Sequence, residues 1–309
     1  MKLKSLLVLL FSSVLLQVSA QISLQIKPVR PVYMLYDSIA IRTLVRNYSS
    51  HPLAFGSSKA LQGEVRFHII APDRTIVHPS GDPNQLLQGI ILSPGEIKNF
   101  TFDLRRYFDL QEEGFYTIRM TVKHPQFSAV YESNETSFKI RKGRVLWQRK
   151  FGLPDYTGEK RKNGKIENRT YKLLSFADVR HIFYYMMIED DKRVYAVRRI
   201  GLDMGSNLPP QREIDALARL HILLAQTPKI FVYYIYNFNG VLEKRDVYFR
   251  TNASAPELVL DPIKSTVRID GGRLALKDVD YDELKKLPVF DQVRTKKNLF
   301  DTAPKQKED

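Results

Sequence analysis

Residues 93–97 read Ser-Pro-Gly-Glu-Ile, and this stretch decides how the first part of the chain is built. Proline presets the φ angle at the second position of a turn, and glycine accepts the positive φ that a type II turn requires at the third. The stretch therefore predicts a type II turn around Pro94 and Gly95. A β-strand should restart at Ile97.

The residues around this turn predict an all-β unit. Short runs rich in β-branched and aromatic residues are separated by Pro, Gly and Asn, which is the usual pattern of strands and turns. Strands at this spacing are the content of an immunoglobulin-like sandwich, here predicted over residues 21–142. The predicted strands are Ile22–Ile26, Ile39–Val45, Glu64–Ile70, Lys98–Phe102, Tyr116–Val122 and Ser137–Ile140.

Residues 112–118, Glu-Glu-Gly-Phe-Tyr-Thr-Ile, carry a second signal for the same fold. They resemble the acidic-x-Gly-x-Tyr-x-Cys sequence of a tyrosine corner, with Ile118 where immunoglobulins place their second cysteine. In a tyrosine corner the hydroxyl of Tyr116 would bond a backbone group near residues 109–111. An ordinary half-buried strand tyrosine is the alternative interpretation.

Taken together, the first domain resembles the immunoglobulin-like sandwich modules of bacterial exported proteins. The resemblance covers about 100 residues and implies the fold only. Such modules precede some zinc proteases, but the motif H-E-x-x-H is absent and Ile182 follows His181, so the protease option fails. The shared residues are Asn47-x-Ser49-x-x-Pro52, Ser93-Pro94-Gly95-Glu96, Asp103-Leu104-x-x-Tyr107-x-Asp109-Leu110 and Gly114-x-Tyr116.

The first twenty residues predict export. Lys2 and Lys4 precede an apolar run from Leu6 to Val18, and the small-residue pattern Val18-Ser19-Ala20 is typical of signal cleavage. The run is shorter than the roughly 20 apolar residues of a spanning helix, so a membrane anchor is disfavoured. We expect a mature chain that starts at Gln21 and does not span a membrane.

Composition narrows the class further. The sequence has no cysteine, which excludes disulfides, thiol catalysis and thiolate metal sites and favours a bacterial periplasm or exterior. Loss of the signal would lower the net charge from +14 to +12, a balance that favours anionic partners. The Asn-x-Ser/Thr triplets, such as those at Asn47 and Asn252, match the acceptor sequence for N-linked glycans. Because so short a pattern occurs freely by chance, we interpret these triplets as incidental.

Beyond the sandwich we predict a second β-rich domain of hairpins or meanders at residues 143–272. Asn239-Gly240 favours a type I′ hairpin turn, and Asn163-Gly164 suggests another hairpin over Tyr156–Phe176. Pro210–Gln226 fits either one helix or two consecutive strands, with strands favoured. The other predicted strands are His181–Ile188, Arg193–Ile200, Ile230–Asn237, Val241–Phe249, Glu257–Leu260 and Ser265–Ile269. Residues 273–309 are expected to form a charged, partly disordered tail, with a short helix over Asp280–Leu287 and disorder over Asp291–Asp309.

A basic segment is the first candidate binding site. Residues 141–172 hold eleven basic and three acidic side chains, so this tenth of the chain carries a net charge of +8. Exposed charges act together over about 8 Å at physiological salt. The segment should adhere to anionic envelope polymers without sequence or sugar specificity, and no specific nucleic-acid partner is expected. The alternative is a solvated linker. Its candidate contact residues are Lys160, Arg161, Lys162 and Lys165.

An aromatic strand is the second candidate. In Phe231–Tyr236, alternate residues face opposite ways, so Tyr234 and Tyr236 share one face. That face could be an aromatic platform for a sugar or a partner protein. The alternative is a central strand that is buried on both sides.

No catalytic group, metal site or cofactor is predicted. The histidines show no ligand spacing on one element, and Glu189-Asp190-Asp191 lacks the alternating ligands of a calcium loop. We therefore expect a non-enzymatic exported module that binds an envelope polymer or another envelope protein. The alternatives are a hydrolase of envelope polymers, with its site in the second domain, and a periplasmic chaperone with an open edge strand.

Overall fold

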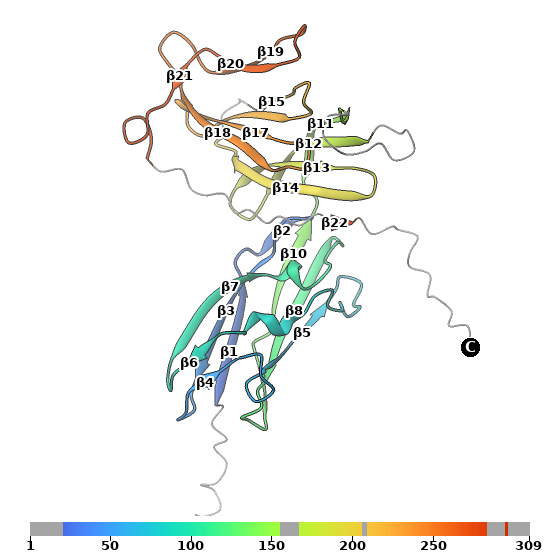
Figure 1. Ribbon diagram of the computed structural model, residues 1–309, viewed down its shortest axis with the longest axis vertical. Helices are drawn as coiled ribbons and strands as arrows, with labels where there is room; N and C mark the ends of the chain where they lie inside the picture. Colours follow the sequence, from blue (N-terminus) through green and yellow to red (C-terminus); the bar gives the residue numbers. More distant parts are fainter. Residues whose placement is uncertain (1–20, 155–166, 206–208, 283–293, 296–309) are drawn as a thin grey trace, which may run out of the picture. The chain divides into compact units, whose positions relative to one another are not determined.

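A computed structural model of the chain describes residues 21–154, 167–205, 209–282 and 294–295 (Figure 1). The chain divides into two compact units. The described part of the first comprises residues 21–31, Ser38–Leu110 and Gly114–Lys139, whereas the second comprises Val32–Asp37, Gln111–Glu113 and the described residues from Ile140 onward. Helical turns within these ranges are two 3₁₀ segments, η1 (Pro83–Leu86) and η2 (Leu104–Arg106).

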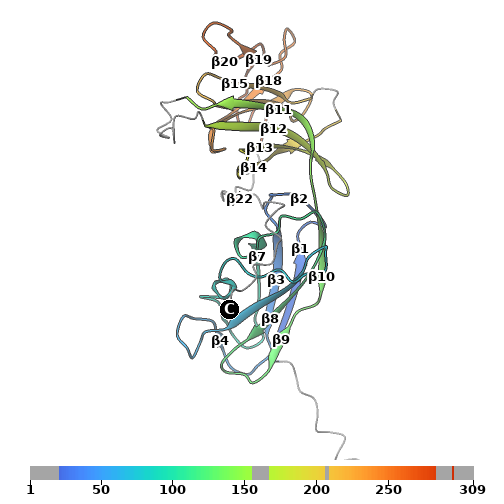
Figure 2. The same cartoon turned by 90° about the vertical axis from the view of Figure 1, so that its right-hand side faces the viewer.

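Two sheets build the immunoglobulin-like part, visible in blue and green in Figure 2. One sheet has the order β1 (Ile22–Pro28), β3 (Ala40–Asn47), β7 (Ile97–Asp103), and the other has β2 (Val32–Met34), β10 (Thr136–Arg141), β8 (Gly114–Lys123), β5 (Glu64–Ile70), with β9 (Val130–Glu132) also on β8. The short strands β4 (Leu53–Ala54) and β6 (Ile91–Leu92) pair with each other. Alternate residues of β8 are buried, as expected for a strand with one face on a core. All the strands predicted for residues 21–142 are confirmed.

The type II turn predicted around Pro94 and Gly95 is confirmed. Its φ is +77°, and the Glu96 amide donates to the Ser93 carbonyl at 3.0 Å, which closes the type II turn before β7 begins at Ile97. Tyr116 is 1% exposed and stacks on Phe138 with ring centroids 5.5 Å apart. The half-buried alternative is therefore wrong, while the tyrosine-corner hydrogen bond stays a prediction.

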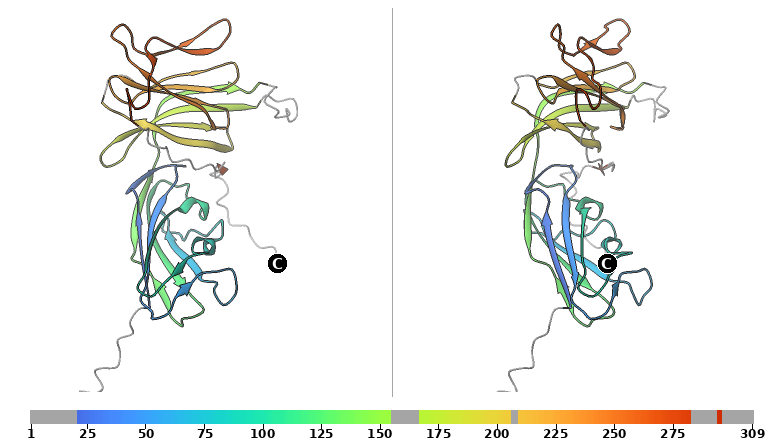
Figure 3. Two further views of the ribbon diagram at one scale, coloured as in Figure 1. Left: turned by 60° about the vertical axis from the view of Figure 1, so that its left-hand side comes forward. Right: turned by 90° about the vertical axis from the view of Figure 1, so that its left-hand side faces the viewer.

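The second unit contains two five-stranded antiparallel meanders (Figure 3). The first has the order β11 (Arg144–Gly152), β12 (Asn168–Ala177), β13 (Ile182–Glu189), β14 (Arg193–Leu202), β22 (Arg294–Thr295). The second has β15 (Gln211–Ile214), β16 (Leu220–Ala225), β17 (Ile230–Tyr236), β18 (Leu242–Phe249), β21 (Arg273–Leu274). A separate hairpin joins β19 (Glu257–Leu260) and β20 (Val267–Asp270).

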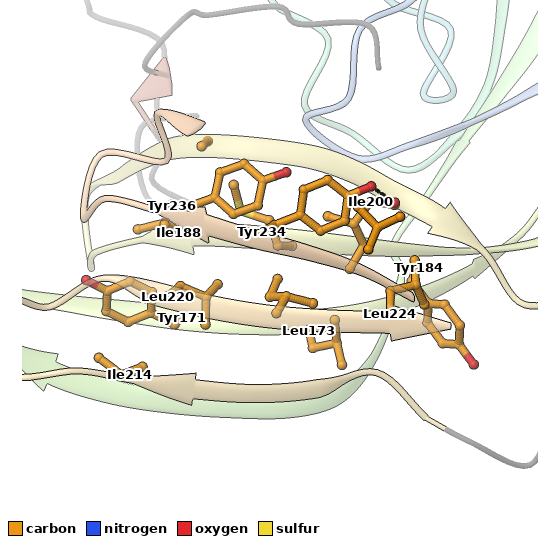
Figure 4. Close-up of a cluster of buried hydrophobic side chains, with 14 of the residues drawn as sticks. Tyr171, Leu173, Tyr184, Ile188, Ile200, Ile214, Leu220, Leu224, Tyr234 and Tyr236 are labelled. Carbon is orange, nitrogen blue, oxygen red and sulfur yellow. Dashed lines mark hydrogen bonds between the residues drawn. The ribbon is translucent and has the colours of Figure 1, made fainter. Parts of the chain in front are cut away.

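The two meanders bury one shared core. Side chains such as Tyr171, Leu173 and Ile200 from the first sheet meet Leu220 and Tyr234 from the second, as Figure 4 shows. The opposite face of β17 packs against apolar residues of the β19–β20 hairpin. Strand β17 is thus buried on both sides, which explains why its sequence is apolar or aromatic at every position.

Several sequence expectations in this unit are resolved. The favoured strands over Pro210–Gln226 are confirmed as β15 and β16. The predicted 156–176 hairpin is only half right, because the partner of β12 is β11, which ends before residue 156. The turn at Asn239-Gly240 is not type I′, since among its residues only Gly240 has a positive φ.

The prediction of disorder over Asp291–Asp309 is wrong at two residues. Arg294 and Thr295, within the stretch expected to be disordered, pair with β14 through its available backbone edge. Residues 283–287 of the predicted short helix, and the remainder of Asp291–Asp309, lie outside the described residues. Within the described ranges, no helix is both long enough and apolar enough to cross a bilayer.

Candidate functional site

A cavity of about 450 Å³ opens at the end of the first meander where β12 begins. Three pieces of chain meet there because β12 pairs with both β11 and β13, and β13 turns directly into β14. The cavity thus collects polar residues from one strand end, one strand start and one hairpin turn. The lining residues are Lys150, Glu167, Asn168, Arg169, Thr170, Asp190, Asp191, Lys192, Arg193 and Tyr195.

Arg169 is the buried cation of this cavity. Its side chain is only 2% exposed, and its guanidinium lies 3.8 Å from the centre of the Tyr195 ring. Its Nη1 atom is 3.6 Å from a Glu167 oxygen and 3.9 Å from an Asp190 oxygen, both beyond hydrogen-bond length. Its Nη1 atom also donates to the Asn168 carbonyl at 3.3 Å. Cation–π stacking, this hydrogen bond and the two ion pairs hold the positive charge at the cavity wall.

Asp190 organises the hairpin turn at the cavity wall. Its Oδ1 accepts the amides of Lys192 at 2.7 Å and Arg193 at 2.6 Å, and its Oδ2 accepts the Tyr195 hydroxyl at 2.7 Å. Burial opposes ionisation of this carboxyl, but these hydrogen bonds outweigh burial and lower its pKa. Burial and the Asp190 hydrogen bond raise the pKa of Tyr195 to about 12. The turn is a local hydrogen-bonded structure, which supports the solvated-turn interpretation over a calcium contact.

Three exposed cations form the rim of the cavity: Lys150, Lys192 and Arg193. In the described parts of the chain, none of the three has a carboxylate within ion-pair distance. Arg169 brings the cationic lining to four side chains, and Glu167, Asp190 and Asp191 supply three carboxylates. We call this set of cations and carboxylates the Arg169 cavity.

None of the site residues predicted from the sequence lines the Arg169 cavity in the described part of the chain. Lys160, Arg161, Lys162 and Lys165 lie outside the described residues, between β11 and β12 in sequence. Tyr234 and Tyr236 are 0% and 2% exposed, and the Tyr234 hydroxyl donates to the Ile200 carbonyl at 3.1 Å (Figure 4). The proposed tyrosine platform is therefore wrong, because both rings fill the core between the sheets. The alternative of a strand buried on both faces is confirmed.

Sequence reasoning missed the Arg169 cavity as a unit. Arg169 and Lys150 belong to the basic segment, whereas Arg193 was predicted as the first residue of a strand and Lys192 lies just before it. The sequence signal that could have revealed the cavity is that two consecutive hairpins share β12. Sharing this strand places the polar start of β12 beside the polar turn between β13 and β14. Among the described residues, no group of three or more His, Asp or Glu side chains could hold a metal ion.

The architecture defines the class as a mainly β protein with an immunoglobulin-like sandwich and a second sandwich of meanders. No protein-family profile matches the chain, and no curated protein sequence matches it significantly. Solved structures similar to part of it are the CARDB domain of PF1109 from Pyrococcus furiosus, in complex with di-metal ions, and an NMR structure of that domain. Both have a TM-score of 0.26 and 17% identity and cover 39% of this chain, and the match covers 87% and 94% of those chains respectively.

A third similar structure is the sporulation control protein Spo0M from Bacillus subtilis. It shows 7% identity and a TM-score of 0.26 over 55% of this chain and 79% of that chain. Similarity at this level assigns neither a ligand nor an activity.

Proposed function

We propose that this protein is an exported, non-enzymatic binding module of a bacterial cell envelope, periplasmic or extracellular, that holds an anionic envelope polymer at the Arg169 cavity. The main support for this proposal is the position of the Arg169 guanidinium, which is buried at the cavity. Three further cations stand on the cavity rim, and none of them has an ion pair among the described residues. Burial strengthens the electrostatic field of such a group, because solvent screens it less than it screens an exposed lysine.

Binding is favoured over hydrolysis by the state of the carboxylates. A glycoside hydrolase needs one carboxylic acid that is still protonated near neutral pH, which requires a raised pKa. In the Arg169 cavity the pKa of Asp190 is lowered instead. This carboxylate is suited to accept hydrogen bonds rather than to donate a proton.

The chaperone alternative is disfavoured at the β1 edge of the immunoglobulin-like sandwich. Donation of a partner strand requires free backbone groups on an edge strand. The Asn134 side chain instead accepts from the Ile26 amide and donates to the Ile26 carbonyl, each at 3.0 Å. These two hydrogen bonds occupy the backbone groups of Ile26 that an incoming strand would use.

The test compares two variants of the mature chain that lose equal charge. Lys192→Gln/Arg193→Gln removes two rim cations, and Lys229→Gln/Lys264→Gln removes two exposed lysines elsewhere in the same unit. On an anionic resin, the rim variant should elute at clearly lower salt than the control variant, because clustered charges act together. Equal elution of the two variants would contradict a role for the Arg169 cavity.

A further inference from the structure

A second cavity, of about 480 Å³, lies at the other end of β12 and lacks an assigned role. Its residues come from the ends of β10 and β12, the starts of β11 and β13, and the chain after β14. Cross-strand register places Arg144 opposite Ser175 and Ser175 opposite Tyr184, so a guanidinium and two hydroxyl-bearing residues form one row. The lining residues are Arg141, Lys142, Arg144, Leu146, Ser175, Phe176, Ala177, Ile182, Tyr184, Asp203 and Pro209. We call it the Arg144 cavity.

The Arg144 cavity combines a cationic rim with an aromatic wall and a hydrogen-bond acceptor. Arg144 is exposed and has no ion pair with any residue that the structure describes, while Arg141 donates to the Ala177 carbonyl and lies 5.6 Å from the Phe176 ring centre. Burial and a hydrogen bond to Asp203 raise the pKa of Tyr184 to about 12. Tyr184 thus stays neutral at physiological pH, and its ring, which is 7% exposed and belongs to the core between the sheets, closes one wall of the cavity.

The two cavities are the ends of one continuous edge. Strand β12 has ten residues, so its ends are about 30 Å apart. Strand β11 runs beside it and pairs on one side only among the described strands. Between the cavities, β11 carries Arg149, which is half-exposed and contacts Glu213 at 3.9 Å, and then the rim residue Lys150.

Both cavities place carboxylates beside their cations, and this restricts the chemistry of the ligand. A polyphosphate or a nucleic-acid backbone offers charge but few donors for Asp203, Glu167 or Asp190. A polysaccharide of sugar acids offers carboxylates to the arginines and lysines, and hydroxyl donors to the protein carboxylates and to Ser175.

We infer that the polymer is a carboxylated polysaccharide and that one extended chain runs along β11 from the Arg144 cavity to the Arg169 cavity. This inference rests on the proposed function and specifies its ligand class and path. A chain that reaches both cavities makes the second contact intramolecularly, which raises the apparent affinity without any new type of contact.

The test is calorimetric titration of the mature protein with oligogalacturonates of increasing length. Affinity should rise by at least tenfold, on the order expected for bivalent contact, once the oligomer spans about 30 Å. Arg144→Gln should remove this step, and because Arg144 is exposed its loss should not affect folding. Lys229→Gln, an exposed lysine in the same unit, should keep the step.

Four outcomes would overturn the inference: a smooth rise without a step, an unchanged step in Arg144→Gln, equally tight binding of polyphosphate of matched length, or binding of neutral malto-oligosaccharides. The proposed function fails separately, if the rim variant and the control variant elute together from the anionic resin. If resin retention depends on the rim cations but the affinity shows no step with oligomer length, the path along β11 is refuted and the proposed function is not.

Discussion

His221 Nε2 lies 3.1 Å from Asp215 Oδ2 in the interior of the second unit, and both residues are at most 3% exposed. The other ring nitrogen of His221 is 2.5 Å from the Tyr233 hydroxyl. Arg219 completes the network with Nε 2.7 Å and Nη2 2.6 Å from the same Asp215 oxygen. The network joins β16 and β17 to the turn that precedes β16, so its role is to lock that turn.

Replacement of Asp215 should be strongly destabilising. In Asp215→Asn the buried His221 and the one-third-exposed Arg219 lose their shared carboxylate. Removing one partner of a fully buried ion pair costs about 3–5 kcal/mol, which is the upper limit for this change. The free energy of unfolding, measured in urea, should fall accordingly. Asp191→Asn, an exposed turn residue, is the control and should change it by less than about 0.5 kcal/mol. A similar effect of the two changes would show that the network contributes little.

Acid should weaken the protein through the same carboxyl. Burial opposes the ionisation of Asp215, but hydrogen bonds from His221 and Arg219 outweigh it and lower its pKa to about 2. A depressed carboxyl pKa stabilises the fold above the unfolded-state value of about 3.9, and this contribution is lost as the pH falls towards the folded-state value. Between about pH 5 and pH 2 the wild type should lose on the order of 2 kcal/mol more than Asp215→Asn. Parallel losses in the two proteins would refute this assignment.

Gly240 should resist substitution more than Gly89. Both have positive φ, +77° and +82°, but a Cβ at Gly240 would overlap Ala196, whereas nothing lies within 4 Å at Gly89. Gly89→Ala should cost only about 1 kcal/mol of backbone strain. Gly240→Ala should cost that amount plus about 1–3 kcal/mol for overpacking. Thermal unfolding of both variants measures the difference, and equal midpoints would exclude the overlap.

Asn47 should not accept a glycan despite its Asn-x-Ser triplet. Its side chain is fully buried, and its Nδ2 donates to the His51, Leu92 and Ser93 carbonyls at 2.8, 3.1 and 3.3 Å. Asn47→Ala should cost about 1–3 kcal/mol, because these buried carbonyls lose a partner. Asn252→Ala, at an exposed position, should be neutral. Mass spectrometry of the protein secreted from a eukaryotic host tests the modification, and a glycan on Asn47 would contradict the buried position.

The four cations between β11 and β12 in sequence give the last prediction. Replacing Lys160, Arg161, Lys162 and Lys165 by Gln should lower retention on an anionic resin at low salt, because these charges belong to the basic segment that also supplies Lys150 and Arg169. At high salt the quadruple variant and the wild type should elute alike, since screening removes the difference. Equal retention at low salt would show that these side chains are not the contact.

Local sequence patterns were sufficient to predict most of the strands and the turn at Gly95. Strand periodicity and the φ preferences of Pro and Gly act over a few residues, so they can be read without knowledge of distant partners. The same locality explains the error at Asn239-Gly240, where a bulge in the β17–β18 pairing lengthens the turn. The absence of cysteine and the excess of basic residues are also properties of the sequence alone.

Tertiary structure alone decided which charges meet and which aromatic side chains face solvent. Arg169 and Asp190 approach because β12 pairs with β13 in one register, and a shift of one residue would turn either side chain to the opposite face. Tyr234 is buried because a second sheet covers its face of β17, and the hairpin of β19 and β20 covers the other. Strand pairing and sheet packing join residues that are distant in sequence, so a strand's own pattern predicts its faces but not what covers them.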